Sequence, residues 1–455
     1  MLAVDSVVQG TAELLVAGRG PVDDAFKRAV IDSREVERGD LFFALHGEHH
    51  DGHNFVDEAV ARGASGLVVD RPLDAPKGVA VFQVSDSLSA LQRLAAYWRR
   101  RHETRVIGVT GSVGKTTCKE LIATVLSARW PVLKSAANLN TEIGLPLTLL
   151  QLTPRHRRTV LEMAMYGRGE ISLLCRIAQP QIGVVTNVGP VHMERLGSIG
   201  AIASAKAELV EALPEDPDGI GILNGDDSRV AAMASRTRAR VLLYGQSQQC
   251  HVRGSDLKGR GLDGISFRLT YGDTSVEVET PLPGRHHIYP ALAAAAVGLS
   301  EGMTLTEIAE ALRQARPELR LRVLHTPNGA TVLDDSYNAS PQSMLAVLDL
   351  LAELPARRIA LLGEMRELGA AAEEGHRQVG ERAAACTDLL LVVGEPARPL
   401  YEAALRAGAT EARFFNSPSD AVPVLRDELR PEDHLLVKAS RAVALEAVVE
   451  ALVAP

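Results

Sequence analysis

The stretch that decides the fold is "GVTGSVGKTT", Gly108 to Thr117, which follows a short apolar run that begins at Arg105. Its small residues let backbone N–H groups approach phosphate oxygens, while Lys115 can reach the outer phosphates and the Thr116 hydroxyl can bind Mg²⁺. In the common pattern G-x-x-x-x-G-K-[ST], the first glycine would fall at Val109. The stretch therefore predicts a phosphate loop with an unusual start, and by itself it leaves a kinase, a GTPase or a ligase open.

Length and composition limit the classes of protein. A chain of 455 residues is too long for one core, and its 46% apolar and 23% charged residues are ordinary for a globular protein. The net charge of -8 argues against a nucleic-acid binder. The four scattered cysteines suggest a reducing compartment, and no stretch has the ~20 apolar residues that a membrane span needs. With no signal peptide apparent, we expect a cytoplasmic protein.

Apolar runs and helical stretches divide the chain into three α/β regions. Residues 1–101 carry the strand-like runs "GDLFFAL" and "GLVVD" and then a helix that ends in a basic cluster from Arg99 to Arg101. We interpret that cluster as a solvated helix end, with a phosphate patch as the alternative. In residues 102–315, strands alternate with helices, which predicts a mainly parallel sheet, and "ISFRLTYGDTSVEVETP" predicts an added antiparallel hairpin. Residues 316–455 repeat strand and helix as a second doubly wound unit.

Polar side chains follow apolar strands downstream of the phosphate loop. Glu162 stands at the end of one strand, and His192 comes just past the end of another. Ligands of sheet-based sites gather at such ends. Either residue alone would more often be structural, but the two together favour metal or phosphate chemistry.

Lys206 has an unusual position in "AIASAKAELVEAL". The apolar stripe of this helix includes Ile202 and Leu209, and Lys206 lies between them, on or beside the buried face. Burial lowers the pKa of an amine, and a neutral amine can react with CO₂ to give a carbamate, which is an anionic metal ligand. Periodicity alone favours the plainer alternative, a lysine whose stem covers apolar surface while its head reaches water.

Taken together, the motifs resemble the Mur ligase family. They are "TGSVGKTT", "NLNTEIGLPLTLL", "LEMAMYGRGEI", "NVGPVHMERLGS", "AKAEL", "LNGDD", "LPGRHH", "DDSYNASPQSM", "GEMRELG" and "VKASR". In that family a loop of the form T-G-[ST]-x-G-K-T replaces the usual start, which accounts for Val109. The resemblance covers nearly the whole chain, and "DSREVERGDLFFALHGEHHDGHNFVDEA" is similar to the family's UDP-binding segment.

The resemblance implies a fold and an activity. It implies a UDP-substrate domain (1–101), a central ATP-binding domain (102–315) and a C-terminal Rossmann-like domain (316–455) that closes over ATP. "DDSYNASP" and "GEMRELG" point to the members that join D-alanyl-D-alanine to UDP-N-acetylmuramoyl-tripeptide through an acyl phosphate, in peptidoglycan precursor synthesis. A ligase that adds the third amino acid, a folylpolyglutamate synthase-like ligase and a nucleotide-binding regulator remain the alternatives. We expect a monomer without nucleic-acid or membrane partners, and the third residue of the tripeptide stays open.

Residue roles follow from the same resemblance. The ATP-binding residues implied are Thr110, Gly111, Ser112, Val113, Gly114, Lys115, Thr116, Thr117, His287, Arg320 and Asp335. The catalytic set is Lys115, Asn138, Glu162, His192 and Lys206, in which Thr116, Glu162, His192 and a carbamate on Lys206 hold Mg²⁺. The substrate-binding set is Ser33, Arg34, Tyr337, Asn338, Lys438 and Ser440.

Two segments depart from the family pattern. The segment that often reads "GRHNxxNAL" here reads "GRHHIYPAL", so His287 and Pro290 replace two asparagines at the expected adenine site, and His286 or His287 would have to serve there. Ala439 stands where "KGSR" has glycine.

Overall fold

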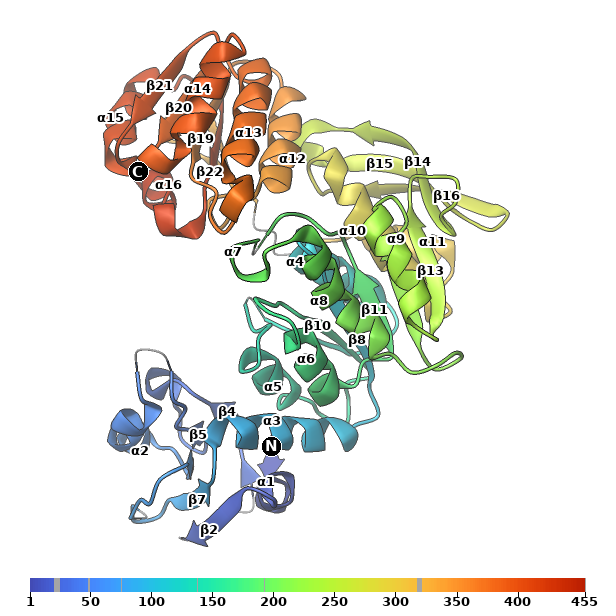
Figure 1. The fold of residues 1–455 in the computed structure, drawn as a ribbon, viewed down its shortest axis with the longest axis vertical. Helices are drawn as coiled ribbons and strands as arrows, with labels where there is room; N and C mark the ends of the chain where they lie inside the picture. The colour runs from blue at the N-terminus through green and yellow to red at the C-terminus, as the bar shows by residue number, and fades with distance from the viewer. Residues whose placement is uncertain are drawn as a thin grey trace.

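The protein is described from a computed structural model, which covers residues 1–19, 25–47, 50–74, 76–136, 138–191, 193–316 and 321–454. The three regions follow one another along the long axis of the molecule, from the N-terminal region at one end to the C-terminal region at the other (Figure 1). Each region is built on its own main sheet, so the α/β class expected from the alternating pattern is confirmed.

The N-terminal region is built on a small mixed sheet with the strand order β2-β7-β6-β5-β4. Its strands are β1 (Leu2–Ala3), β2 (Leu15–Arg19), β3 (Ala25–Phe26), β4 (Ala29–Val30), β5 (Leu41–Phe43), β6 (Gly66–Val69) and β7 (Ala80–Val84), where β1 pairs with β3 apart from the sheet. Its helices are α1 (Val4–Thr11), η1 (Ser33–Glu35), η2 (Gly52–Phe55), α2 (Val56–Arg62) and α3 (Ser87–Arg100).

Helix α3 lies between the N-terminal region and the central region (Figure 1). Leu91 and Ala95 of α3 belong to the same buried apolar cluster as Leu149 and Leu174 of the central region. Trp98 adds a hydrogen bond from its indole N–H to the Leu152 carbonyl, at 3.1 Å. The two regions therefore share one continuous core.

Arg99 corrects one expectation about this helix. The sequence favoured a solvated basic helix end, but Arg99 is only 6% exposed. Its guanidinium donates to the carbonyl of Ala178 at 3.0 Å and to that of His102 at 3.3 Å. Carbonyl groups in the last turn of a helix lack hydrogen-bond partners within that helix. The Ala178 carbonyl is one of these, and Arg99 of the N-terminal region donates to it.

The central region is built on a long sheet with the strand order β16-β15-β14-β13-β12-β11-β8-β10-β9. Its strands are β8 (Arg105–Thr110), β9 (Val132–Lys134), β10 (Arg158–Glu162), β11 (Ile182–Val185), β12 (Ile220–Asn224), β13 (Arg240–Gly245), β14 (Val252–Gly259), β15 (Ile265–Tyr271) and β16 (Thr274–Thr280). Strands β8 to β14 run parallel, and β15 and β16 form the expected antiparallel hairpin at the edge.

Helices cover both faces of this sheet. They are α4 (Lys115–Ser127), α5 (Gly144–Leu149), α6 (Glu170–Ala178), α7 (Met193–Leu196), α8 (Ile199–Glu211), α9 (Ser228–Ala231), η3 (Ala232–Arg236), η4 (Gly261–Asp263), η5 (Arg285–His287), α10 (Ile288–Ser300) and α11 (Leu305–Arg313). Helices α4 and α10 pack together in one apolar cluster, while α6 and α8 belong to the other. Because β11, β8 and β10 are parallel neighbours, the loops at their carboxyl ends meet at one edge of the sheet.

The C-terminal region is a doubly wound unit with the strand order β17-β18-β22-β19-β20-β21. Its strands are β17 (Arg322–His325), β18 (Thr331–Asp334), β19 (Arg358–Gly363), β20 (Leu389–Val393), β21 (Ala412–Phe415) and β22 (His434–Lys438), and only the pairing of β17 with β18 is antiparallel. Its helices are α12 (Pro341–Ala352), η6 (Gly369–Ala371), α13 (Ala372–Cys386), η7 (Glu395–Ala397), α14 (Arg398–Arg406), α15 (Pro418–Glu428), η8 (Arg441–Val443) and α16 (Glu446–Val453). Within the described ranges, no helix is both long and apolar enough to cross a bilayer.

Candidate active site

The phosphate loop joins β8 to α4, as the sequence predicts. Gly111 has a backbone φ of +150° and Gly114 has one of +81°, values that residues other than glycine rarely adopt. A Cβ added to Gly111 would also lie 1.9 Å from the Thr186 hydroxyl oxygen. The Lys115 ammonium donates to the carbonyls of Gly111 at 2.9 Å and Ser112 at 3.1 Å. In this conformation the ammonium lies against the carbonyls of its own loop.

The loop after β11 holds the phosphate loop in place. The Val113 amide donates to the Asn187 side-chain oxygen at 2.9 Å, and the Asn187 side-chain nitrogen donates back to the Val113 carbonyl at 2.9 Å. The Thr186 hydroxyl donates to that carbonyl too, at 2.8 Å. The Ser112 hydroxyl accepts from the Gly189 amide at 2.8 Å. These hydrogen bonds hold the phosphate loop against the segment after β11, and they give Asn187 a role that the motif analysis missed.

Glu162 lies at the end of β10 directly beside the phosphate loop. One carboxylate oxygen accepts from the Thr116 hydroxyl at 2.9 Å, and the other accepts from the Asn140 amide at 2.9 Å. Glu162 is 1% exposed, and its backbone N–H donates to the Ser135 hydroxyl at 3.0 Å. Hydroxyl and carboxylate oxygens of this kind are the ligands that Mg²⁺ prefers, so these residues fit a magnesium ion next to the loop.

Two predicted residues near this edge, both within the described ranges, make no hydrogen bond to Glu162. Asn138 is exposed in a turn, and the amide that reaches Glu162 belongs to Asn140. Thr110 is fully buried, and its hydroxyl donates to the Met163 carbonyl at 2.9 Å, so its side chain faces the sheet. The positions of His192 and Arg320 lie outside the described residues.

Lys206 is buried in the middle of α8. It is 2% exposed, and its amine has no hydrogen-bond or ion-pair partner among the described residues. Its pKa lies well below the ordinary value, first because burial removes the ammonium from water and second because Lys115 adds a positive charge nearby. The structure therefore brings a buried lysine with a lowered amine pKa close to the phosphate loop.

The C-terminal region contributes a buried lysine, Lys438, and a cluster of polar partners around it at the end of β22. The ammonium of Lys438, 2% exposed, donates to the Asp335 carboxylate at 2.5 Å and to the Asn338 carbonyl at 2.8 Å. The Ser440 hydroxyl accepts from the Arg366 amide at 2.9 Å, which ties the "VKASR" loop to the "GEMRELG" loop. Three of the residues predicted from the C-terminal motifs are thus in direct contact.

Tyr337 lies beside this cluster and is 38% exposed. The Arg441 guanidinium lies over its ring, 5.3 Å from the centroid. The neighbouring acid, Asp334, is buried and binds Arg322 at 2.5 Å. Two adjacent aspartates therefore have different surroundings: Asp334 is tied to β17, whereas Asp335 faces Lys438.

The C-terminal region approaches the phosphate loop through the start of α12. A Cβ added to Gly189 would lie 2.5 Å from the Gln342 side-chain oxygen. Gly189 is itself bound to Ser112 of the phosphate loop. Farther along, the Met193 amide donates to the Glu367 carbonyl at 3.1 Å. The two regions are therefore in contact around the loop even though each has its own core.

His286 and His287 lie at the start of α10 with ring centroids 4.1 Å apart. The Nδ1 of His287 pairs with the Pro283 carbonyl at 2.7 Å, and burial lowers the pKa of His287 to about 4. The pKa of His286 also lies well below its ordinary value, mainly because of burial, and its Nδ1 is buried without a hydrogen-bond partner. Of the two candidates for adenine recognition, His286 is therefore the one with a buried ring nitrogen that lacks a hydrogen-bond partner among the described residues.

Ser33 and Arg34 lie in η1, far from the phosphate loop. The Ser33 hydroxyl donates to the Glu58 carboxylate at 2.7 Å. Arg34 is exposed and forms a two-point contact with Asp32, whose pKa falls to about 2 chiefly through that hydrogen bonding. These residues do not join the central site, and they mark a separate surface in the N-terminal region.

Comparisons with known proteins agree along the whole chain. The family model described as Mur ligase middle domain matches residues 109–298, that described as Mur ligase, glutamate ligase domain matches 319–441, and that described as Mur ligase family, catalytic domain matches 27–99. A protein of Synechocystis sp. named UDP-N-acetylmuramoyl-tripeptide–D-alanyl-D-alanine ligase is 42% identical, over 93% of this chain and 91% of its own.

Solved structures agree as well. A crystal structure of MurF from Acinetobacter baumannii has a TM-score of 0.89 and 30% identity, and the match covers 100% of this chain and 99% of that one. The structure of MurF ligase from Thermotoga maritima in complex with ADP has a TM-score of 0.82 and 29% identity, with 93% and 96% covered. The similarity thus includes the relative orientation of the regions as well as their separate folds.

Proposed function

This chain belongs to the Mur ligase family, and on that premise we propose that it joins D-alanyl-D-alanine to UDP-N-acetylmuramoyl-tripeptide at the expense of ATP. The observation that supports the proposal is a phosphate loop whose Thr116 bonds to Glu162 in the central region, together with a buried Lys438 that bonds to Asp335 in the C-terminal region. The name of the Synechocystis relative supports the choice of substrates.

The central region would carry out the first step, in which the terminal carboxylate of the tripeptide attacks the γ-phosphorus and ADP departs. Backbone N–H groups between Gly111 and Thr116 would hold the phosphates, helped by the N-terminus of α4. Lys115 would turn from the loop carbonyls to the β- and γ-phosphates. A magnesium ion held by Thr116 and Glu162 would supply positive charge against the transferring phosphoryl group. Asn138 would lie near the γ-phosphate, and Asn140 would orient Glu162.

The C-terminal region would carry out the second step, in which the dipeptide amine attacks the acyl phosphate and inorganic phosphate leaves. Tyr337, Asn338 and Ser440 would line the dipeptide site. Lys438 would stabilise the negative charge that develops on the attacked carbonyl oxygen, because a preorganised cation in a dry site needs no rearrangement during the reaction. Asp335 would hold that ammonium in place and, with Arg320, close this region over ATP.

The two remaining sites would bind the ends of the substrates. Ser33 and Arg34 would contact the UDP-sugar, which lies at the far end of the substrate from the reacting carboxylate. His286 or His287 would contact the adenine where the family often has asparagine. The unused Nδ1 of His286 favours His286 for that contact.

Lys206 would act as a carbamate in the active enzyme. Its neutral amine would add to CO₂ with loss of one proton, and the resulting carboxylate-like group would help His192 hold a second magnesium ion. Burial of the amine and the absence of a partner among the described residues support this reaction. An ordinary snorkelling lysine would instead place its head in water.

A phosphate-release assay tests the proposed activity. ATP, Mg²⁺, UDP-N-acetylmuramoyl-tripeptide and D-alanyl-D-alanine should all be required, and tripeptides that end in diaminopimelate or lysine would identify the third residue. Equal turnover without the dipeptide would refute the proposal. Turnover with a free amino acid and a UDP-muramoyl-dipeptide would indicate the ligase that adds the third residue, whereas turnover with a folate would indicate a folylpolyglutamate synthase. Nucleotide binding without any turnover would indicate a regulator.

The setting of the reaction follows from the same proposal. We place it in the cytoplasm, where the four buried cysteines would stay as the free thiols seen in the structure. A single chain carries every proposed substrate site, so we expect a monomer. Light scattering at assay concentrations would check the monomer directly.

A further inference from the structure

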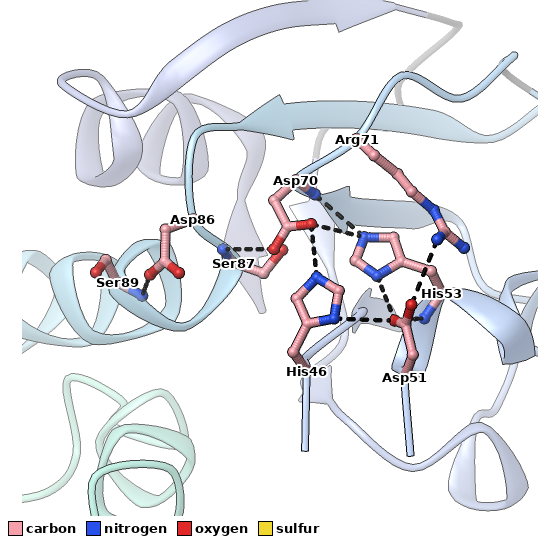
Figure 2. A network of polar contacts seen from close by, with 8 residues as sticks. All are labelled: His46, Asp51, His53, Asp70, Arg71, Asp86, Ser87 and Ser89. Carbon is pink, nitrogen blue, oxygen red and sulfur yellow. Dashed lines mark hydrogen bonds and ion pairs between the residues drawn. The ribbon is translucent and has the colours of Figure 1, made fainter. Parts of the chain in front are cut away.

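A cluster of histidines and aspartates in the N-terminal region has no chemical role in the proposed reaction, although His46, Asp51 and His53 lie in the stretch that resembles the family's UDP-binding segment. Figure 2 shows His46 and His53 directed toward Asp70, with Asp51 on the other side of both rings. His46 follows β5 and pairs with Asp51 in an isolated bridge, His53 lies in η2, and Asp70 follows β6. Three short segments therefore converge on one point.

The distances in this cluster match the edges of a metal polyhedron. Nε2 of His46 lies 3.1 Å from Asp70 Oδ1, and Nε2 of His53 lies 3.2 Å from the same oxygen. All three ligand atoms lie within 4.8 Å of one another. Bonds of about 2.0–2.1 Å in a tetrahedron give ligand–ligand edges of roughly 3.4 Å, close to the two short separations here.

The hydrogen bonds of His53 make one of these contacts unfavourable without a cation. Its Nδ1 lies 2.7 Å from Asp51 Oδ1, so the Nδ1 proton points at Asp51. Its Nε2 accepts from the Asp70 backbone N–H at 3.2 Å, so this nitrogen carries a lone pair. The same nitrogen lies 3.2 Å from the Asp70 carboxylate oxygen, so a metal ion bound there would replace the long hydrogen bond from the Asp70 N–H. Two acceptors at this distance repel each other unless a proton or a metal ion lies between them.

The surroundings of His53 are those of a metal ligand. Its side chain is 2% exposed, and Asp51 behind it fixes the tautomer that presents Nε2. Asp70 is held by the Ser87 backbone N–H at 3.4 Å on its other oxygen. His46 is 58% exposed at the side chain, which leaves one side of the cluster open to water.

The two carboxylates of the cluster carry more negative charge than the paired arginine neutralises. Asp51 and Asp70 bring two negative charges, and Arg71, 3.3 Å from Asp51, is the one permanently charged cation paired with them among the described residues. Two imidazoles and one carboxylate form a borderline ligand set that suits zinc and its first-row neighbours better than Mg²⁺.

We propose that His46, His53 and Asp70 bind one divalent transition-metal ion of the zinc class, with water in the remaining position. The ion would join the segment after β5 to the end of β6. It would also brace α2, which packs on both η2 and η1 and whose Glu58 accepts the Ser33 hydroxyl. The site is separate from Thr116 and Glu162 and has a different ligand chemistry.

Cobalt titration of the chelator-treated full-length protein tests this site. Excess Mg²⁺ is kept in the buffer so that oxygen-rich sites are filled. We expect one equivalent of Co²⁺ to give the intense visible absorption of a tetrahedral ion, and one equivalent of Zn²⁺ to abolish it. A spectrum that stays pale up to several equivalents would overturn the proposal.

Three variants locate the ion. His46→Ala removes an exposed ligand without opening the core, so it should fold and lose the absorption band. Asp51→Asn keeps all three ligands but weakens the support of His53, and it should bind 10- to 100-fold more weakly. His50→Ala, in the same segment but outside the cluster, is the matched control and should bind as the wild type does. A His46→Ala protein that keeps the band would refute the assignment, and the cation of this cluster would then be a proton.

Discussion

The two junctions of the molecule are built differently. Between the N-terminal and central regions, α3 packs on α5 and α6 within one shared apolar core, and the buried Arg99 bonds across the boundary. Between the central and C-terminal regions the cores are separate, and polar contacts such as Arg285 with Glu353 hold the regions together, with Leu262 adding one apolar contact. A shared core moves as one body, whereas a polar junction can open and close at little cost.

This difference suits the proposed reaction. The UDP end of the substrate can rest on a fixed platform, because Ser33 lies on the rigid side together with Lys115. The dipeptide side can move, because Lys438 and Asp335 belong to the region behind the polar junction. A site assembled from two regions in this way usually requires closure before chemistry.

The largest effect should come from Lys115→Ala. The loop binds phosphate chiefly through backbone N–H groups, so ATP binding should partly survive, while the charge that faces the transferring phosphoryl group is lost. We expect kcat to fall by ~10²-fold or more, the scale for removal of one preorganised group. Steady-state assays with an ADP-binding control would show it, and a variant with near-native kcat would remove Lys115 from the mechanism.

Lys206→Ala should come next. Without the carbamate the second magnesium ion loses a ligand, so most of the activity should disappear while the circular dichroism spectrum stays native. Small carboxylates such as formate or acetate should partly restore the rate, because they can fill the space left by the side chain. Full activity in CO₂-depleted buffer, or an unmodified amine at Lys206 in the active enzyme, would exclude the carbamate.

The junctions themselves should differ in their contribution to stability. Trp98→Ala removes an indole from the shared core, and we expect a loss of about 2–3 kcal/mol in the free energy of unfolding, below the range for a fully buried aromatic residue. Trp98→Phe keeps a ring and loses only the bond to Leu152, about 1 kcal/mol. Urea denaturation followed by circular dichroism would measure both.

Glu353→Ala should have the smallest effect. It removes the ion pair with Arg285, whose side chain is 54% exposed, so we expect less than ~1 kcal/mol in the same denaturation experiment. If Glu353→Ala destabilised the protein as much as Trp98→Ala, the two junctions would not differ in the way described here.

Much of the architecture was predictable from the sequence, because strands and phosphate chemistry leave local patterns. The apolar run before Thr110 and the glycines around the loop predict β8, the turn and α4. The period-two pattern predicts the hairpin of β15 and β16. Glu162 was recognised because it ends an apolar strand, and its contact with Thr116 follows once β8 and β10 are neighbours.

Other features depend on tertiary contacts that no local pattern encodes. Asn187 holds the phosphate loop only because β11 lies beside β8 in the sheet. Asn140 and Asn138 are two positions apart, and the turn between them decides which one reaches Glu162. Arg99 looks like a solvated helix end until α6 is placed against α3 and offers its carbonyls.

The most direct test of the account is a pair of distances measured by electron–electron double resonance. The four native cysteines are buried, so spin labels can be confined to introduced ones. Exposed positions are Asp57, Asp273 and Thr410, used as the pairs Asp57→Cys with Asp273→Cys and Asp273→Cys with Thr410→Cys. With a non-hydrolysable ATP analogue and the UDP-tripeptide bound, the Asp273–Thr410 distance should shorten while the Asp57–Asp273 distance stays constant. A constant Asp273–Thr410 distance, or a change across the N-terminal junction instead, would contradict it.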